Sequence, residues 1–292
     1  MTFFTGSDKI FIMNHLAIIG GSGLYDIENL EVTSEHEIET PFGWPSDQIK
    51  EIVTPSGKKA FFLARHGQNH QFAPSEINYR ANVYALKKLG CRYICSFSAA
   101  GSLREEIKPG DFAIVEQYID WTKAKRARSF FTDGIAGHIS MASPSYDPQN
   151  SFLNEHLPES TSVHQKTCYV CIEGPSLSSK AESKFYQSIG ADVIGMTNLP
   201  EANLAREAGM AYSSVAMVTD FDAWKDDVPF DLNALLATMK YNTAAAKKAI
   251  ANIIEQFDST KLNYNPENKF SVITKPDSLS ERQKELVNLL LS

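Results

Sequence analysis

Leu16-Ala17-Ile18-Ile19-Gly20-Gly21-Ser22-Gly23 places a glycine-rich turn directly after a short apolar run. Two further apolar runs are followed by polar loops: Phe61–Leu63 by Ala64-Arg65-His66-Gly67, and Tyr93–Cys95, after two more residues, by Ser98-Ala99-Ala100-Gly101. In an open α/β sheet, the loops that follow the strands gather at the carboxyl ends of those strands, where ligands bind. The sequence therefore predicts three loops at one edge of a sheet.

The three loops together carry donors suited to a single anion. They offer backbone N–H groups, hydroxyls, the Arg65 guanidinium and the His66 imidazole, a set that fits a free phosphate ion. Gly21-x-Gly23 is a weak match to a dinucleotide-binding motif, because Asp26 stands in place of the third glycine. The P-loop pattern Gly-x-x-x-x-Gly-Lys is absent from the sequence. A Rossmann or P-loop nucleotide-binding protein is therefore a minor alternative.

Strand-like runs alternate with helical patterns along most of the chain, which is typical of a sheet with helices packed on it. The expected strands cover residues 15–19, 59–64, 92–97, 111–116, 167–172, 192–196 and 211–218. The expected helices cover residues 78–89, 178–189, 199–208 and 232–256. We expect a single α/β domain over residues 14–257, with a central mixed β-sheet flanked by helices.

The two ends of the chain differ from this pattern. Residues 1–13 carry no convincing signal peptide, and we expect them to form a disordered extension. Residues 258–292 begin with a polar segment and end in a predicted helix over 278–291, capped by Ser278 or Ser280. We expect this C-terminal segment to pack on the domain or on a neighbouring subunit. The apolar face of the long helix over 232–256 is expected to lie in the core.

Composition excludes several classes of partner. The chain has 292 residues, of which 43% are hydrophobic and 22% charged, as in an ordinary globular protein. A net charge of −7 argues against binding to nucleic acid, so a phosphate needs a local positive pocket. No apolar stretch approaches the ~20 residues of a membrane span, and we expect no membrane association.

The cysteines and the basic residues have simple interpretations. Cys91, Cys95, Cys168 and Cys171 are expected to be free thiols in a reducing cytoplasm. Cys168-x-x-Cys171 lies in a strand-like run that directs its ends to opposite faces, and no metal site is predicted. The basic stretch Lys123–Arg128 is interpreted as a solvated loop rather than a nucleic-acid or phosphate site.

Polar residues also follow three later strands. These segments are Glu173-Gly174-Pro175, Gly195-Met196-Thr197-Asn198 and Thr219-Asp220-Phe221-Asp222. Asp220 and Asp222 occupy alternate positions of an extended segment, so both side chains project to one side. Mutual repulsion and partial burial would raise the pKa of at least one of them and make it a candidate general acid. A turn or a helix N-cap is the simpler explanation of the same carboxylates.

Nine stretches of the chain, in order, resemble the trimeric purine nucleoside phosphorylase family. They are IIGGSGLYD, ETPFGWPSD, FLARHGQNH, INYRANVYALKKLGC, AAGSLREEIKPGD, HISMASP, CIEGPSLSSKAES, DVIGMTNLPEANLAREAG and VAMVTDFDAWK. The resemblance implies the fold of that family, a homotrimer or a dimer of trimers, and inorganic phosphate as a co-substrate without any other cofactor. It also implies phosphate-dependent cleavage of S-methyl-5′-thioadenosine to adenine and 5-methylthioribose 1-phosphate, a step of methionine and purine salvage.

The resemblance further implies roles for matching residues. Phosphate would be held by Ser22, Arg65, His66, Ser98, the backbone of Ala99, and Thr197. The nucleoside would contact Leu177, Gly195, Met196, Asp220, Asp222 and, across a subunit interface, His138. The expected catalytic residues are Asp220, Asp222 and His66.

Asp220 bears on the choice of base, because 6-oxopurine enzymes of the family carry Asn there. The exocyclic amine of adenine is a donor that pairs with a carboxylate, whereas O6 of hypoxanthine is an acceptor that pairs with an amide. The sequence therefore favours a 6-aminopurine. Val228, Leu232 and Leu235 offer an apolar environment to a 5′-methylthio group.

The chain departs from the family pattern at a few of these positions. Leu177 stands in place of Phe, Gly195 in place of Asn, and Ser98-Ala99-Ala100-Gly101 in place of Thr-Ala-Cys-Gly. These changes bear on fine specificity. The alternatives are a phosphorylase of 6-oxopurine nucleosides or 5′-methylthioinosine, and a nucleoside-binding protein without catalysis. The predicted phosphate residues argue against the last.

Overall fold

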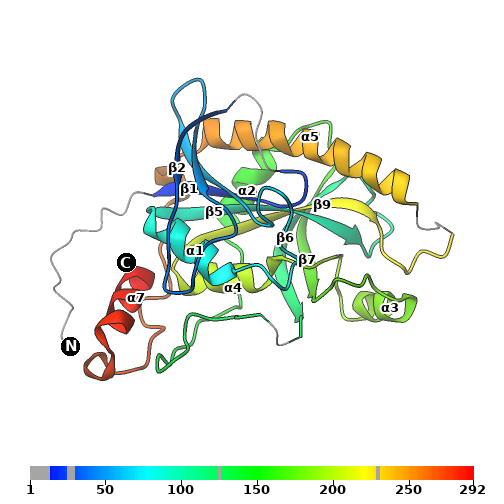
Figure 1. Cartoon of the computed structure of the whole chain (residues 1–292). Helices are drawn as coiled ribbons and strands as arrows, with labels where there is room; N and C mark the ends of the chain where they lie inside the picture. Colours follow the sequence, from blue (N-terminus) through cyan, green and yellow to red (C-terminus); the bar gives the residue numbers. More distant parts are fainter. Residues whose placement is uncertain (1–13, 25–29, 124–125, 228–230) are drawn as a thin grey trace.

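A mixed sheet of nine strands forms the centre of the computed structural model, which describes residues 14–24, 30–123, 126–227 and 231–292 (Figure 1). The strand order is β2-β3-β4-β1-β5-β8-β7-β6-β9. The strands are β1 His15–Gly20, β2 Glu31–His36, β3 Ile49–Val53, β4 Lys59–Ala64, β5 Cys91–Ser102, β6 Phe112–Trp121, β7 Val163–Ile172, β8 Val193–Gly195 and β9 Ala211–Phe221. The expected extension over residues 1–13 lies outside the described residues.

Helices cover both faces of this sheet. They are α1 Tyr79–Lys88, α2 Asp147–His156, α3 Lys180–Ser188, α4 Asn198–Glu207, α5 Leu232–Gln256, α6 Ser259–Leu262 and α7 Glu281–Leu291, with a 3-10 turn over Pro276–Ser278. Leu16 and Ile18 of β1 share an apolar cluster with residues of α2 and α5, whereas Ala17 and Ile19 share one with α1, α4 and α7. Successive strand residues point to opposite faces, so β1 buries both of its sides. Figure 1 shows α5 along one side of the sheet and α1 and α4 along the other. The predicted α/β fold is confirmed.

The first two predicted loops lie at one edge of the sheet. Strands β4, β1 and β5 are adjacent and parallel, so their carboxyl ends point the same way. Gly21 follows β1 and Arg65 follows β4, and the Arg65 N–H donates to the Gly20 carbonyl over 2.9 Å. The third predicted loop, Ser98–Gly101, is wrong, because these residues belong to β5. Pairing with β9 continues through Ser102 and holds this stretch extended, with a register shift after Ala100.

Five strands close into a ring that joins the two halves of the predicted site. β5, β8, β7, β6 and β9 pair in turn, and β9 pairs again with β5. Gly101 of β5 is paired with Ile194 of β8 on one side and with Asp220 of β9 on the other. The ends of β8 and β9, far apart in sequence, therefore lie next to the polar segment of β5.

Local sequence signals account for several helix ends. The Asn78 side chain caps α1, which is followed by Gly90 in the left-handed conformation that glycine adopts without strain. Ser179 and Glu182 form a reciprocal capping box at the start of α3. Ser280 caps α7 as one of the two predicted candidates, and Leu286 and Leu290 of α7 lie in the apolar cluster that also contains α1.

Helix α5 has the predicted length, but its apolar face is not buried throughout. From Asn242 to Ile254 the inward residues are buried, whereas Leu236 and Tyr241 are about half exposed. Leu235 and Met239 line a cavity instead of the core. The expectation of a continuous core face is therefore wrong for the first turns, which extend past the end of β9.

Five elements were not predicted: β2, β3, α2, α6 and the 3-10 turn over Pro276–Ser278. β2 is an exposed strand of a hairpin with β3, and α2 buries only Gln149 and Leu153.

The four cysteines are free thiols as predicted, and Cys168 is only partly buried. Within the described parts of the chain, no helix is both long and apolar enough to cross a membrane.

Candidate active site

A cavity of about 390 Å³ opens at the carboxyl ends of the strands, between the sheet and the first turns of α5. This volume is typical of a small-molecule site. The cavity is lined by Gly21, Ser22, Arg65, His66, His70, Pro74, Ser98, Ala99, Ala100, Gly101, Ile172, Pro175, Leu177, Ser178, Ile194, Gly195, Met196, Thr197, Thr219, Asp220, Asp222, Leu235 and Met239. The fold therefore brings together most of the residues that the sequence singled out.

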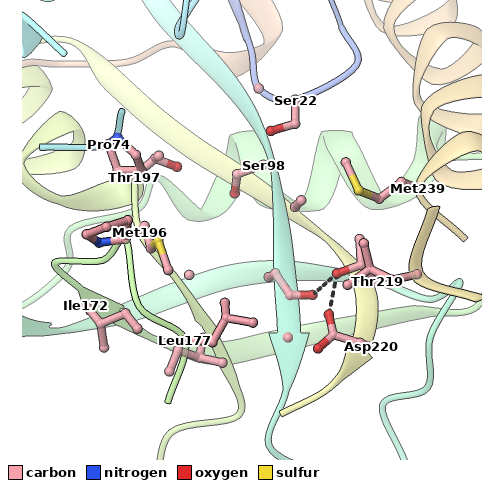
Figure 2. A pocket seen from close by; sticks show the side chains of 18 of the residues that line it. Ser22, Pro74, Ser98, Ile172, Leu177, Met196, Thr197, Thr219, Asp220 and Met239 are labelled. Atoms are coloured by element: carbon pink, nitrogen blue, oxygen red, sulfur yellow. Dashed lines mark hydrogen bonds between the residues drawn. The ribbon is translucent and has the colours of Figure 1, made fainter. Parts of the chain in front are cut away.

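Hydroxyl groups gather in one half of this cavity. Figure 2 shows Ser22, Ser98 and Thr197 in the upper half of the view, away from Leu177 and Asp220. Thr197 directly precedes Asn198, the first residue of α4, but Leu199 has non-helical backbone angles, so the regular turns of this helix begin after it. The Ser98 hydroxyl donates to Asn198 Oδ1 over 3.2 Å and is thereby held beside the same helix end. This half offers hydroxyl and amide donors to an oxyanion.

Arg65 differs from the free guanidinium that the sequence suggested. Its side chain is fully buried, and Nε and Nη2 donate to the two carboxylate oxygens of Glu201 over 2.7 and 3.0 Å. Nη2 also donates to Ser96 Oγ, and Nη1 donates to the Phe97 carbonyl. These contacts use four of the five guanidinium N–H groups.

The Arg65–Glu201 pair is electrically balanced inside the protein. Burial opposes the charge on Arg65, but the Glu201 carboxylate more than compensates and holds the guanidinium pKa above its ordinary value. Nη1 lies beside Gly21, at 2.9 Å from where a Cβ there would stand. Arg65 therefore lines the cavity from a fully buried position, and the Glu201 carboxylate balances its charge.

His66 has a defined proton position. Its Nδ1 is 2.9 Å from the Phe72 carbonyl, which only accepts, so Nδ1 carries the proton and Nε2 of the neutral ring is an acceptor. Burial, followed by the charge of Arg65, lowers the pKa of His66 to about 4. The ring stacks on His70 with centroids 4.4 Å apart. In its neutral form, His66 can accept a hydrogen bond from the hydroxyl of a protonated phosphate.

Two carboxylates stand at the other end of the cavity, on and just after β9. Burial raises the pKa of Asp220, with a smaller contribution from the Asp222 charge, while a hydrogen bond of 2.6 Å from Thr219 Oγ1 opposes the shift. Thr219 Oγ1 also lies 3.2 Å from the Ala100 carbonyl, as the dashed lines in Figure 2 show. Among the described residues, Asp222 Oδ2 is buried and lacks a hydrogen-bond partner. A carboxylate oxygen at this position can accept a hydrogen bond from a donor group of a ligand in the cavity.

Apolar side chains complete the walls. Ile172, Leu177, Met196, Leu235 and Met239 line the cavity, and Leu177 is 63% exposed. Met239 belongs to the apolar face of the helix over 232–256, which was expected to lie in the core, so the sequence did not indicate it as a site residue.

Three sequence candidates are not placed in the cavity wall. Leu232 is 57% exposed at the start of α5 and does not line the cavity. The residues of α5 that face the cavity, Leu235 and Met239, come after it. His138 is exposed on a loop and does not line the cavity. Its backbone N–H donates to the Ser271 carbonyl. Val228 lies outside the described residues.

Three buried polar residues near the cavity could not be identified from the sequence. From the sequence, Glu201 would be a solvent-exposed position of the helix predicted over 199–208. The structure shows that it is buried and forms an ion pair with Arg65. Tyr169 places its hydroxyl 2.0 Å from where a Cβ at Gly195 would stand, so glycine is required there. Arg126 contradicts the solvated-loop interpretation of Lys123–Arg128, because its side chain is fully buried in an ion pair with Glu173.

Comparison with known proteins identifies relatives of the whole domain. The family model described as "Phosphorylase superfamily" matches residues 15–257. An S-methyl-5′-thioadenosine phosphorylase of Geobacter sulfurreducens is 42% identical over 281 residues, covering 94% of this chain and 97% of the relative.

Solved structures give the same result. A methylthioadenosine phosphorylase from an antarctic soil metagenomic library superposes with a TM-score of 0.84 at 41% identity, covering 96% of this chain and 100% of the other. The methylthioadenosine phosphorylase of Schistosoma mansoni in complex with adenine gives a TM-score of 0.77 at 33% identity, covering 85% of this chain and 94% of the other.

Proposed function

The chain belongs to the phosphorylase superfamily, and on that premise we propose that it cleaves S-methyl-5′-thioadenosine with inorganic phosphate. The products are adenine and 5-methylthioribose 1-phosphate. The observation that carries the proposal is the carboxylate pair, in which Asp220 has a raised pKa and Asp222 has a buried oxygen without a partner. The relatives named for this activity support the same substrate.

The carboxylates suit a departing 6-aminopurine. A protonated Asp220 donates to N7 of the base and so removes the negative charge that develops when the glycosidic bond breaks. The exocyclic amine of adenine is a donor, and the oxygens of Asp220 and Asp222 are acceptors. A 6-oxopurine would place an acceptor against these oxygens, at a cost of about 1–3 kcal/mol for each unsatisfied group.

The hydroxyl-lined half suits the attacking phosphate. Ser22, Ser98, Thr197 and the Ala99 backbone N–H hold it near the anomeric carbon, with one N–H from Arg65 and the acceptor Nε2 of His66. Holding the nucleophile in place converts a bimolecular step into an effectively unimolecular one. The phosphate charge also stabilises the ribosyl cation that forms as the base leaves.

Leu235 and Met239 give one wall of the cavity an apolar character that suits the methylthio group better than a hydroxyl. His138 and Leu232, which lie outside the lining, are proposed to act through a neighbouring subunit or a closed form of the site.

We propose a homotrimer, or a dimer of trimers, in which His138 serves the site of a neighbour. The loop of His138 is joined to residues 271–273 by a β-bridge between Gly137 and Val272. Phe270 and Ile273, which flank this bridge, are 78% and 62% exposed, and exposed apolar side chains of this size are typical of an interface. The free thiols support a cytoplasmic location.

Base release from four nucleosides tests the activity. S-methyl-5′-thioadenosine, adenosine, inosine and 5′-methylthioinosine are each incubated with and without phosphate, and free base is measured by chromatography. We expect phosphate-dependent release of adenine, fastest from S-methyl-5′-thioadenosine. Release of hypoxanthine alone would support the 6-oxopurine alternative, and no release from any nucleoside would support a binding protein.

A further inference from the structure

The buried arginine of the basic stretch makes an unusual set of contacts behind the cavity. Nε of Arg126 donates to Glu173 Oε1 over 2.9 Å, and Nη1 donates to the carbonyls of Met196 and Leu199 over 2.6 and 2.8 Å. Nη2 donates to the Glu173 carbonyl over 2.9 Å. The side chain has no exposed surface and does not line the cavity. All three nitrogens therefore hold backbone or carboxylate groups of the protein.

These contacts join two segments that are far apart in sequence. Met196 and Leu199 belong to the junction between β8 and α4, whereas Glu173 follows β7. The two segments already touch, because a Cβ at Gly174 would stand 2.5 Å from Met196 Sδ. Glu173 in turn accepts the Lys123 backbone N–H, so the loop that carries Arg126 is held to the same point.

The segments that Arg126 joins form one wall of the cavity. Ile172, Pro175, Leu177 and Met196 line it on this side, whereas Ser22, His66 and Ser98 lie on elements that Arg126 does not contact in the described structure. A shift of Met196 relative to Pro175 would therefore reshape the wall that faces the nucleoside. It would also move Thr197, which follows Met196, but it would leave Ser22, Arg65 and His66 in place.

We propose that Arg126 is a positioning residue for the nucleoside. Arg126 sets the distance between the Glu173–Leu177 segment and Met196. The inference rests on the proposed function, since it takes the nucleoside to lie against this wall. Only the planar fork of arginine reaches all these acceptors at once, because lysine presents a single ammonium on a flexible stem. Glu173 balances the buried charge and keeps the fork in place.

The test compares Arg126→Ala and Arg126→Lys with Arg128→Ala. Arg128 is a matched control from the same loop, because its hydrogen-bond and ion-pair partners in the described structure are Thr122 and Asp120 and its side chain is 39% exposed. The readouts are KM for S-methyl-5′-thioadenosine, KM for phosphate, and calorimetric affinity for the nucleoside without phosphate. We expect both Arg126 variants to weaken nucleoside binding by about tenfold or more and to change KM for phosphate by less than about threefold. Arg128→Ala should stay within about twofold of the wild type in both.

Chemical rescue separates positioning from general stability. Millimolar guanidinium should restore nucleoside affinity to Arg126→Ala, because it can occupy the vacated space and bond the same carbonyls, whereas methylammonium should not. If Arg126→Ala does not fold, the proposal is tested with Arg126→Lys, by comparing the change in its KM for S-methyl-5′-thioadenosine with the change in its KM for phosphate. Equal weakening of both substrates, or wild-type affinity in Arg126→Lys, would overturn the proposal. A wild-type protein that binds the nucleoside but releases no base would contradict the proposed function alone, and the affinities would still test Arg126.

Discussion

Replacing Glu201 by glutamine removes the counter-charge of Arg65 with almost no change in shape. The Glu201 carboxylate accepts from Arg65 Nε and Nη2, from Ser96 Oγ over 2.8 Å and from the Tyr212 hydroxyl over 2.8 Å. Arg65 and Glu201 have side chains that are 0% and 1% exposed, so water cannot replace the lost acceptor. In Glu201→Gln, an amide donor faces the guanidinium and a cation remains buried without compensation.

The expected cost is about 3–5 kcal/mol in the free energy of unfolding, as for other buried ion pairs that lose one partner. For a chain of this length, that corresponds to a decrease in Tm on the order of 10 °C. Glu267→Gln is the matched control, because Glu267 also pairs with an arginine, Arg206, but its side chain is 69% exposed. We expect that change to cost less than about 1 kcal/mol.

Phosphate should partly reverse the effect. An anion in the cavity supplies the missing negative charge to Arg65 through Nη1, so phosphate should raise the Tm of Glu201→Gln more than that of the wild type. Thermal unfolding at a series of phosphate concentrations measures both quantities. The reasoning fails if Glu201→Gln unfolds within about 1 kcal/mol of the wild type. Equal phosphate stabilisation of both proteins would show that Arg65 does not reach the anion.

Asp220→Asn should lower the rate of adenine release by about 10²–10⁴-fold, because the general acid is lost, and should shift the preference toward 6-oxopurine nucleosides; the ratio of kcat/KM values for adenosine and inosine checks this. The fold lowers the pKa of His66 from 6.5 to about 4, so the ring is neutral in the folded protein. The contribution of His66 to the free energy of unfolding is therefore complete above pH 6.5 and is lost as the pH falls toward 4. The difference in unfolding free energy between the wild type and His66→Asn should therefore shrink over that window, and a constant difference would contradict it. Gly195→Ala should destabilise the protein by about 1–3 kcal/mol through its clash with the Tyr169 hydroxyl. Adding Tyr169→Phe should recover only part of that loss, because the ring carbon Cζ would still stand 2.7 Å from the added Cβ, and denaturant unfolding of the double variant measures the recovery.

Local patterns predicted what depends on neighbours in the chain. The apolar run Leu16–Ile19 predicted a strand over residues 15–19, and the structure confirms it as β1. Ser280, one of the two predicted caps of the last helix, accepts from the backbone N–H of Gln283, three residues away. Asp220 and Asp222, two positions apart on an extended segment, both line the cavity.

Contacts between distant segments could not be predicted in the same way. Ser98–Gly101 has the composition of a loop, yet pairing with β9 makes it a strand. The first turns of α5 carry the same apolar period as the later turns, but they extend past the sheet, so Met239 faces a cavity and Ile253 the core.

The sequence by itself determined the succession of strands and helices, the polar segments that follow the strands, and the side chains available for a phosphate and a purine. These properties depend on the period of the side chains and on bonds that span a few residues. Only the tertiary structure decided that Arg65 is balanced by Glu201, 136 residues away, and that Arg126 is buried behind the cavity. A charged side chain looks solvent-exposed in the sequence, and burial becomes favourable only when the fold brings its acceptors from several elements to one place.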